Sequence, residues 1–103
     1  MSVLLEFAMF PTDKTESVSA YVGRIISVID QSAYPYQLTS MGTIVETDTI
    51  DEALELVKLC YKVLEPDCKR VYSTLTFDIR KGHDNRMEGK IKSIDEKIIR
   101  NRK

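Results

Sequence analysis

The sequence of 103 residues contains no tryptophan, two cysteines and a single histidine. Cys60 and Cys68 lie too far apart for the CxxC pair of a redox or metal-chaperone site, and one histidine leaves too few ligands for zinc. We therefore expect no metal site, and a reduced pair in which Cys60 serves as a small hydrophobic residue. His83 lies in a polar segment and neither cysteine has an evident activator, so we expect no catalytic residues and no enzymatic activity.

The chain also lacks an excess of positive charge and a long apolar run. Fifteen basic and sixteen acidic residues give a formal net charge of -1, which disfavours nucleic-acid binding. The opening MSVLLEFAMF is interrupted by Glu6 and has no basic leader, so we expect neither a signal peptide nor a membrane span, and a cytoplasmic location. The length and the 43% hydrophobic content predict one domain over residues 1–103.

Hydrophobic periodicity predicts a strand followed by a helix in the first third of the chain. The apolar run Val3–Phe10 has the length of a strand and is closed by Pro11. Helical spacing of apolar residues then predicts a helix over Thr15–Gln31, with Glu16 in its first turn. Its expected inward positions are Val18, Val22, Ile25 and Ile29.

The middle of the chain predicts two short strands and a second helix. The strands are expected at Tyr36–Ser40 and Thr43–Asp48, with Gly42 at the bend between them. Thr49 and Glu52 have the spacing of a capping box, which predicts a helix beginning there and stopping at Pro66. Its expected inward stripe is Leu54, Val57, Cys60 or Tyr61, and Leu64.

The last third predicts one more strand and a terminal helix. Clean alternation over Arg70–Arg80 indicates a strand, and Ile91, Ile94 and Ile98 form a helical stripe. The order β-α-β-β-α-β with an extra C-terminal helix predicts an α+β fold, the ferredoxin-like plait with an antiparallel sheet. Right-handed crossovers place both main helices on one face, put the first and third strands in the centre and leave the other face open.

The open sheet face is expected to mix apolar groups with a few carboxylates and hydroxyls. If Val45 points towards the helices, Ile44 and Glu46 point outward. The outward set of the first strand is either Leu4, Glu6, Ala8 and Phe10 or Val3, Leu5, Phe7 and Met9, and the last strand adds Tyr72, Thr74, Thr76 and Asp78. Such a surface is typical of subunits that pack sheet to sheet or cover a ligand, so we expect self-association to a homodimer or homotetramer.

Glu46 has two interpretations from the pattern alone. It can be a solvated strand carboxylate, or one paired with Arg80 or Arg70, which is the commoner fate of such a residue. Alternatively, with Glu6 or Asp78, it lines a semi-buried cleft and attracts a cation or accepts a hydrogen bond from an amino group.

The segment Met41-Gly42-Thr43-x-Val45-Glu46 is the most specific of several motifs in this chain. Together with weaker matches elsewhere in the chain, it resembles the small thiamine-binding protein family, also catalogued as UPF0045 or DUF77 and related to YkoF-like proteins. Weaker matches are Tyr36, Leu38, Asp51–Leu54, Arg70-Val71, Asp78, Arg80, Lys90 and Ser93-Ile94. The resemblance implies a ferredoxin-like subunit, sheet-to-sheet dimers that often form tetramers, and binding rather than turnover of thiamine or its hydroxymethylpyrimidine moiety. Ser40 and Thr47 depart from the pattern of many relatives, which have Pro and Gly there.

Thiamine is a permanent cation that carries an aminopyrimidine, so a carboxylate, hydroxyl groups and an aromatic wall would each match one of its features. With the resemblance, the candidate ligand-binding residues are Glu46 and Asp78 as carboxylates, Thr43 and Thr74 as hydroxyls, Gly42 for close backbone approach, Ser17 as a donor at a helix start, and Tyr36 or Tyr72 as the wall. No cofactor is expected besides thiamine as the ligand.

Other functions of this fold fit less well. An acylphosphatase needs an arginine-bearing phosphate loop after the first strand, and here FPTDKTES offers only Lys14. RNA recognition would need stacked aromatics on a basic sheet. The remaining alternative is a regulatory or structural oligomeric plait that binds an amino acid or another small metabolite.

Overall fold

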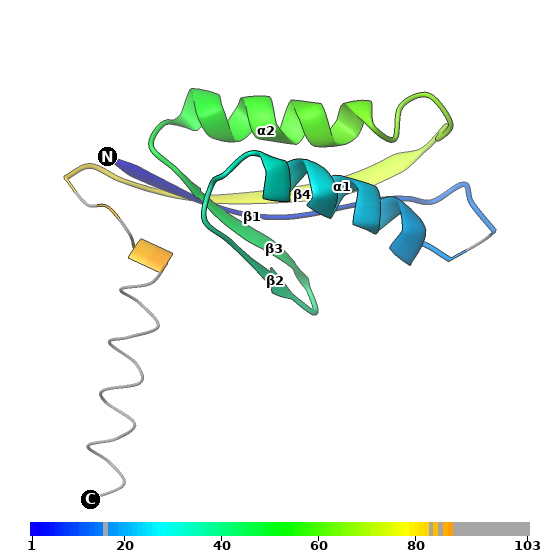
Figure 1. Cartoon of the computed structure of the whole chain (residues 1–103), viewed down its shortest axis with the longest axis horizontal. Helices are drawn as coiled ribbons and strands as arrows, with labels where there is room; N and C mark the ends of the chain where they lie inside the picture. The colour runs from blue at the N-terminus through cyan, green and yellow to red at the C-terminus, as the bar shows by residue number, and fades with distance from the viewer. Residues whose placement is uncertain (16, 83, 85, 88–103) are drawn as a thin grey trace, which may run out of the picture.

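The structure is a computed structural model that describes residues 1–15, 17–82, 84, 86 and 87 (Figure 1). Its elements in chain order are β1 (Ser2–Pro11), α1 (Ser19–Gln31), β2 (Tyr36–Thr39), β3 (Gly42–Thr47), α2 (Ile50–Lys62) and β4 (Val71–Arg80). The strands form one antiparallel sheet in the order β2-β3-β1-β4, which confirms the ferredoxin-like plait with the first and third strands in the centre. The predicted terminal helix lies outside the described residues. Neither α1 nor α2 is long and apolar enough to cross a bilayer.

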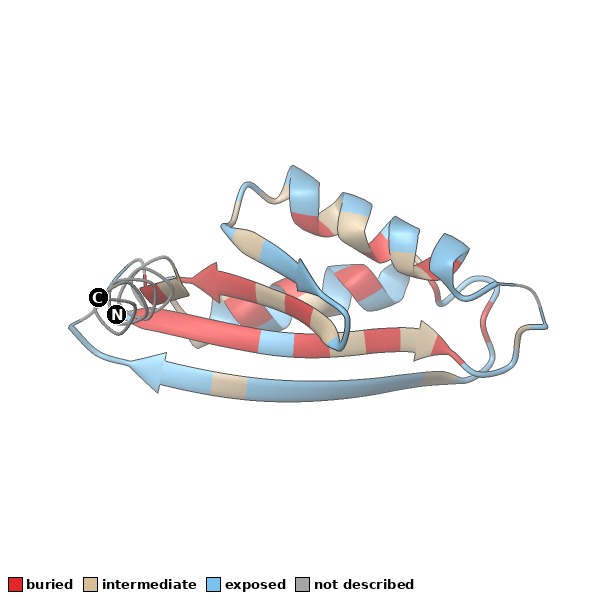
Figure 2. Ribbon diagram, turned by 90° about the horizontal axis from the view of Figure 1, so that it is seen from below, coloured by how far each residue is buried: buried red, intermediate tan, exposed pale blue. Residues whose placement is uncertain are grey.

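The core lies between the sheet and the two helices, which cover the same face (Figures 1 and 2). Leu5 is at its centre, paired with Val45 on one side and Phe77 on the other. Alternation along β1 turns its odd-numbered residues towards the helices, where Ile29 of α1 and Cys60 of α2 are fully buried. Burial raises the pKa of the Cys60 thiol to about 12, so this cysteine is a protonated hydrophobic residue at neutral pH.

Local signals place the hairpin and the start of α2 where the sequence predicts them. Thr39 pairs with Gly42 across a tight turn, and a Cβ at Gly42 would lie 2.8 Å from the carbonyl oxygen of Phe7 in β1. Because glycine has no side chain, the hairpin can approach the central strand this closely. At α2, the Thr49 hydroxyl accepts from the Glu52 amide at 3.1 Å while the Glu52 carboxylate accepts from the Thr49 amide at 3.0 Å, so the capping box is confirmed.

The predicted start of α1 and one of its inward positions are wrong. The helix begins at Ser19 rather than at Thr15, and the exposed Val18 is its N-cap residue without a side-chain hydrogen bond. Tyr21 is buried instead, because the register of the helix turns Tyr21, Ile25 and Ile29 towards the sheet. Glu16 lies outside the described residues.

The predicted stripe of α2 is also partly wrong. Leu54 and Tyr61 are exposed, whereas Ala53 and Leu56 are buried together with the correctly predicted Cys60. The sequence allows either stripe to face the core, because two apolar stripes run side by side along this helix, each with residues three or four positions apart. Packing against β1 and β3 selects the stripe with the small Ala53, and one apolar flank of α2 stays exposed.

Candidate functional site

The open face of the sheet carries a row of residues from β1 that alternate with the core. The outward set is Leu4, Glu6, Ala8 and Phe10, the first of the two sets that the sequence allows. Leu4 lies between Glu46 of β3 and Asp78 of β4. Glu6 lies between Ile44 and Thr76 in the same way. Strand register alone therefore brings three carboxylates to one end of this face.

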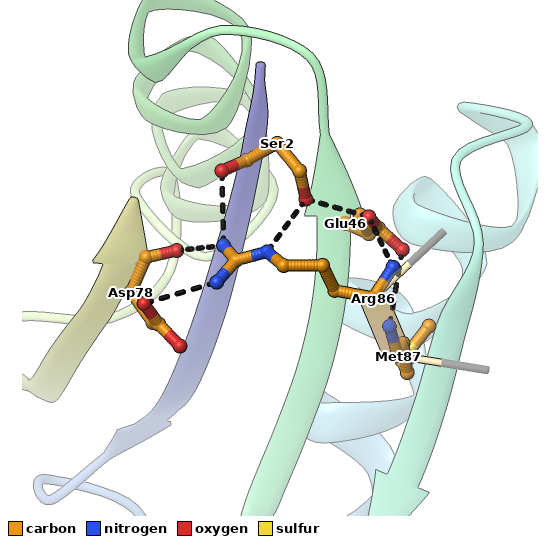
Figure 3. Close-up of polar contacts among 5 residues, drawn as sticks. All are labelled: Ser2, Glu46, Asp78, Arg86 and Met87. Carbon is orange, nitrogen blue, oxygen red and sulfur yellow. Dashed lines mark hydrogen bonds and ion pairs between the residues drawn. The ribbon is translucent and has the colours of Figure 1, made fainter. Parts of the chain in front are cut away.

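Glu46 is buried at this end and is fully engaged by the protein (Figure 3). The hydroxyl of Ser2 donates to its Oε2 at 2.6 Å, and the backbone amide of Arg86 donates to the same oxygen at 3.0 Å. The amide of Met87 donates to Oε1 at 3.4 Å. The carboxylate thus holds the chain at residues 86 and 87 against the sheet.

The contacts of Glu46 lower its pKa despite its burial. Burial would raise it, but the hydroxyl of Ser2, the amides of Arg86 and Met87 and the nearby guanidinium outweigh burial and hold the pKa below its usual value. Glu46 is therefore ionised at neutral pH, and hydrogen-bond donors from the chain itself stabilise its negative charge.

The side chain of Arg86 is almost completely buried, and its guanidinium links β1 to β4, while its backbone amide contacts Glu46 of β3 (Figure 3). Its Nε donates to the hydroxyl of Ser2 at 3.1 Å and its Nη2 to the Ser2 carbonyl at 2.9 Å. Nη2 also donates to the backbone carbonyl of Asp78, and Nη1 pairs with the Asp78 carboxylate at 3.0 Å. Ser2, Glu46, Asp78 and Arg86 together form what we call the arginine clasp.

A hollow of about 410 Å³ lies on the open face next to the arginine clasp. Its walls are mostly apolar and its polar groups are few, a combination that is typical of sites for small molecules. The lining residues are Leu4, Glu6, Gln37, Ile44, Thr76, Asp78 and Met87. We refer to this hollow as the open-face cavity.

Two carboxylates line the open-face cavity, and they differ in how they are engaged. Asp78 is held by Arg86 in the clasp. No hydrogen bond or ion pair from the described part of the chain engages the carboxylate of Glu6, which is exposed on the central strand with Ile44 and Thr76 as its neighbours. Glu6 is consequently the anionic group of this cavity that is available to a ligand.

Four of the predicted ligand-binding residues lie away from this cavity, and the fold does not group them with Glu46, which is itself not among the described lining residues. Thr43 is buried on the helix face, because it is an odd number of residues from Glu46 along the same strand. Tyr36 also faces the helices and donates to Asp30 at 2.8 Å. Gly42 lies in the hairpin turn, and Ser17 lies beyond the carboxyl end of β1, where its hydroxyl bonds with that of Ser19.

Thr74 and Tyr72 do lie on the open face, opposite Ala8 and Phe10, but nearer the other end of β1. The rings of Tyr72 and Phe10 pack with centroids 5.7 Å apart. Neither residue lines the open-face cavity.

The sequence reasoning missed several residues of this region. Arg86 and Met87 belong to a polar stretch that reads as a loop, and Ser2 precedes the predicted strand, so no local signal marks them. Thr76 is expected on the open face but is not among the candidate ligand-binding residues. Gln37 could have been found, because alternation along the paired strands puts it on the same face as Ile44 and Glu46.

The fold and this geometry define a class: a ferredoxin-like domain with an acidic, apolar-walled hollow on its open sheet face. The chain belongs to the thiamine-binding protein family, whose sequence model matches residues 5–95. It is 36% identical to a UPF0045 protein of Methanocaldococcus jannaschii over 94 residues, covering 91% of this chain and 93% of the relative. A UPF0045 protein of Methanothermobacter thermautotrophicus is 35% identical over 83 residues, covering 80% and 84%.

Solved structures support the same fold. A crystal structure of the Methanocaldococcus jannaschii protein superimposes with a TM-score of 0.80 at 36% identity, covering 92% of this chain and 97% of that one. A proposed thiamine biosynthesis or salvage protein of Thermotoga maritima superimposes with a TM-score of 0.79, covering 91% and 99%, and at 22% identity it supports the fold alone.

Proposed function

We propose that this protein binds thiamine, or its hydroxymethylpyrimidine moiety, in the open-face cavity without turning it over. Membership of the thiamine-binding family supports the ligand class. The observation that carries the proposal is the carboxylate of Glu6, which no described residue engages, in a mostly apolar cavity of about 410 Å³.

The chemistry of the lining suits an aminopyrimidine with a cationic ring. Glu6 can accept from the exocyclic amino group or face the positive charge, and both contacts gain strength beside apolar walls that exclude water. Gln37 and Thr76 offer neutral hydrogen-bonding groups, while Leu4 and Ile44 provide flat apolar contact. The direct ligand contact that the sequence predicts for Glu46 is replaced in this proposal by an indirect role. Glu46 accepts a hydrogen bond from the amide of Met87, which lines the cavity, and it adds negative potential nearby.

A second subunit is expected to cover the cavity. The open face bears Leu4 and Ile44 beside the carboxylates and Phe10 towards the other end of β1. Packing this face against the same face of another copy would close the cavity from solvent. This is the sheet-to-sheet dimer that the sequence predicts, and the ligand would lie between the two sheets.

The alternative ligand, an amino acid, fits the cavity less well. Its carboxylate would need a cationic partner, but the lining residues within the described part of the chain include two acids and no lysine or arginine. The guanidinium of Arg86 is already committed to Ser2 and Asp78. An amino acid would therefore bring one buried negative charge against two others.

Calorimetric titration of the purified protein with thiamine, hydroxymethylpyrimidine and a panel of amino acids tests the proposal. We expect heat from thiamine or the pyrimidine, and Glu6→Gln to weaken that binding by roughly 10-fold to 100-fold, since a hydrogen bond to a charged group contributes about 1.5–3 kcal/mol. Glu55→Gln is the matched control, because Glu55 lies on α2 in an exposed pair with Lys58. This control should bind like the unaltered protein.

Two results would contradict the proposal. The first is the absence of heat and of a thermal shift with thiamine and the pyrimidine at millimolar concentration. The second is equal affinity of the Glu6→Gln and Glu55→Gln variants, which would move the ligand away from the open-face cavity.

A further inference from the structure

The negative charge of the open-face cavity comes from two neighbouring strands. Glu6 of β1 and Asp78 of β4 both line the cavity. The register puts Glu6 opposite Thr76, so Asp78, two residues further along β4, is the diagonal neighbour of Glu6 on the same face. Such neighbours lie about 7–8 Å apart. A ligand group placed between them is therefore within a Debye length of both carboxylates, and an anionic group would be repelled from two sides.

The cation nearest to these carboxylates is not available to a ligand. The side chain of Arg86 is only 5% exposed and is not among the described residues that line the cavity. A guanidinium has five N–H donors. Four contacts, two with Ser2 and two with Asp78, use most of them (Figure 3). A phosphate binds arginine best through paired N–H groups, and Arg86 has no such pair left to offer.

Arg80 is the one lysine or arginine that the strand pairing of the described sheet places on the open face. It lies opposite Ser2, beyond Asp78, and is exposed. It does not line the cavity. Water and counter-ions surround an exposed guanidinium and weaken its attraction for an anion inside the cavity. The two lining carboxylates therefore set the sign of the potential there.

The ion pair between Asp78 and Arg86 has two consequences for the cavity. Nη1 of Arg86 holds the Asp78 carboxylate at 3.0 Å, which fixes this negative group in the wall. The Asp78 side chain is 53% exposed, whereas that of Arg86 is buried, so a ligand meets the acid and not the base. The same pair thus presents a carboxylate to the ligand and withholds a guanidinium from it.

We propose that the Asp78–Arg86 pair makes the open-face cavity selective for ligand charge, so that it accepts a cationic or neutral aminopyrimidine and rejects the phosphate ester of the same molecule. This inference rests on the proposed function, because it concerns the ligand of that cavity. A phosphate group carries about -1.5 to -2 charges at pH 7, which makes the singly positive thiamine negative overall. Asp78 is then a specificity-determining residue, and Arg86 is the positioning residue that holds it.

Asp78→Asn is the variant that separates charge from fold. It removes one of the two lining carboxylates and releases Nη1 of Arg86. The contacts of Arg86 with Ser2 and with the backbone carbonyl of Asp78 do not depend on the altered side chain, so the clasp should persist. Asp78→Glu keeps the charge. Glu55→Gln is the matched control, because it removes one negative charge from an exposed position on α2.

Calorimetric titration of each protein with thiamine and with thiamine monophosphate measures the selectivity. The unaltered protein should bind thiamine roughly 10-fold to 100-fold more tightly than the ester, because like charges face each other in the rejected complex. In Asp78→Asn this ratio should fall by roughly 10-fold, since one of the two repelling carboxylates is gone. Asp78→Glu and Glu55→Gln should keep the ratio of the unaltered protein.

The salt dependence of the same titration needs no variant. Raising the ionic strength should reduce the preference for thiamine over its ester, because salt screens the carboxylates. A preference that does not change with salt would mean that the ester is rejected by its size, and this would overturn the proposal.

The remaining outcomes distinguish the charge selectivity from the proposed function. Equal affinities of the unaltered protein for thiamine and the ester, or an unchanged ratio in a folded Asp78→Asn protein, would overturn the selectivity and leave thiamine binding in place. A folded Asp78→Asn protein that binds neither compound would also overturn it, because Asp78 would then be needed for any ligand. Absence of heat from thiamine with the unaltered protein would contradict the proposed function and this inference together.

Discussion

At the residue scale, two glutamates on the same sheet face have opposite situations. Glu46 accepts three hydrogen bonds from Ser2, Arg86 and Met87, so its charge is satisfied by the fold. Glu6 has no such donors among the described residues and faces the open-face cavity. A carboxylate that the protein has not neutralised is the one that a cationic ligand can use.

Replacing Glu46 by glutamine should destabilise the fold in a pH-dependent way. At pH 7 we expect the free energy of unfolding to fall by roughly 1–3 kcal/mol, because charge-assisted bonds to buried donors are lost. Since the pKa of Glu46 is lowered in the folded state, its stabilisation is complete well above its ordinary value of 4.5 and is lost as the pH falls through the lower folded pKa. Urea unfolding at several pH values should therefore show the gap between the two proteins closing on acidification.

Glu55→Gln serves as the control for this experiment, because Glu55 is exposed. If the free energy of unfolding of Glu46→Gln fell on acidification by the same amount as that of the unaltered protein, Glu46 would be solvated. That is the simpler interpretation that its sequence context allows.

At the element scale, α2 shows which signals are local and which are not. Thr49 and Glu52 start the helix through contacts within four residues of chain, so the sequence alone locates this end. The side that α2 buries is decided by the sheet beneath it, because Leu54 and Leu56 are equally apolar and only one of them reaches the core.

Removing the cap of α2 should lower stability by a predictable amount. Thr49→Ala loses the hydroxyl that accepts from the Glu52 amide, and we expect a cost of about 1 kcal/mol in urea unfolding. Ser27→Ala on the exposed side of α1 is the control and should stay within about 0.5 kcal/mol of the unaltered protein. Equal stability of both variants would mean that water replaces the cap without loss.

At the scale of the whole molecule, the open face of the sheet is the surface where the proposed ligand and the proposed second subunit would meet. It carries the open-face cavity and its carboxylates.

Thermal unfolding can separate ligand binding from subunit contact. The melting temperature should rise with protein concentration if assembly stabilises the fold, and rise further with thiamine by mass action. Glu6→Gln should lose most of the thiamine effect, because Glu6 lines the open-face cavity. A thiamine effect of unchanged size in this variant would contradict the proposed site.

The sequence by itself determined the features that depend on near neighbours or on alternation. These are the order of strands and helices, the antiparallel plait, the capping box and the outward direction of Glu46. Each follows from a period of two or 3.6 residues, or from contacts within one helical turn.

Only the tertiary structure decided what the open face does with its charges. The clasp joins Ser2 to Arg86 across 84 positions of chain, and no local pattern encodes such a contact. It engages Glu46 and Asp78 and leaves Glu6 unengaged, and the same packing buries one stripe of α2 and exposes the other. Long-range register and packing distinguish carboxylates that the sequence makes equivalent, and for this reason Glu6, and not Glu46, is the one without a donor among the described residues.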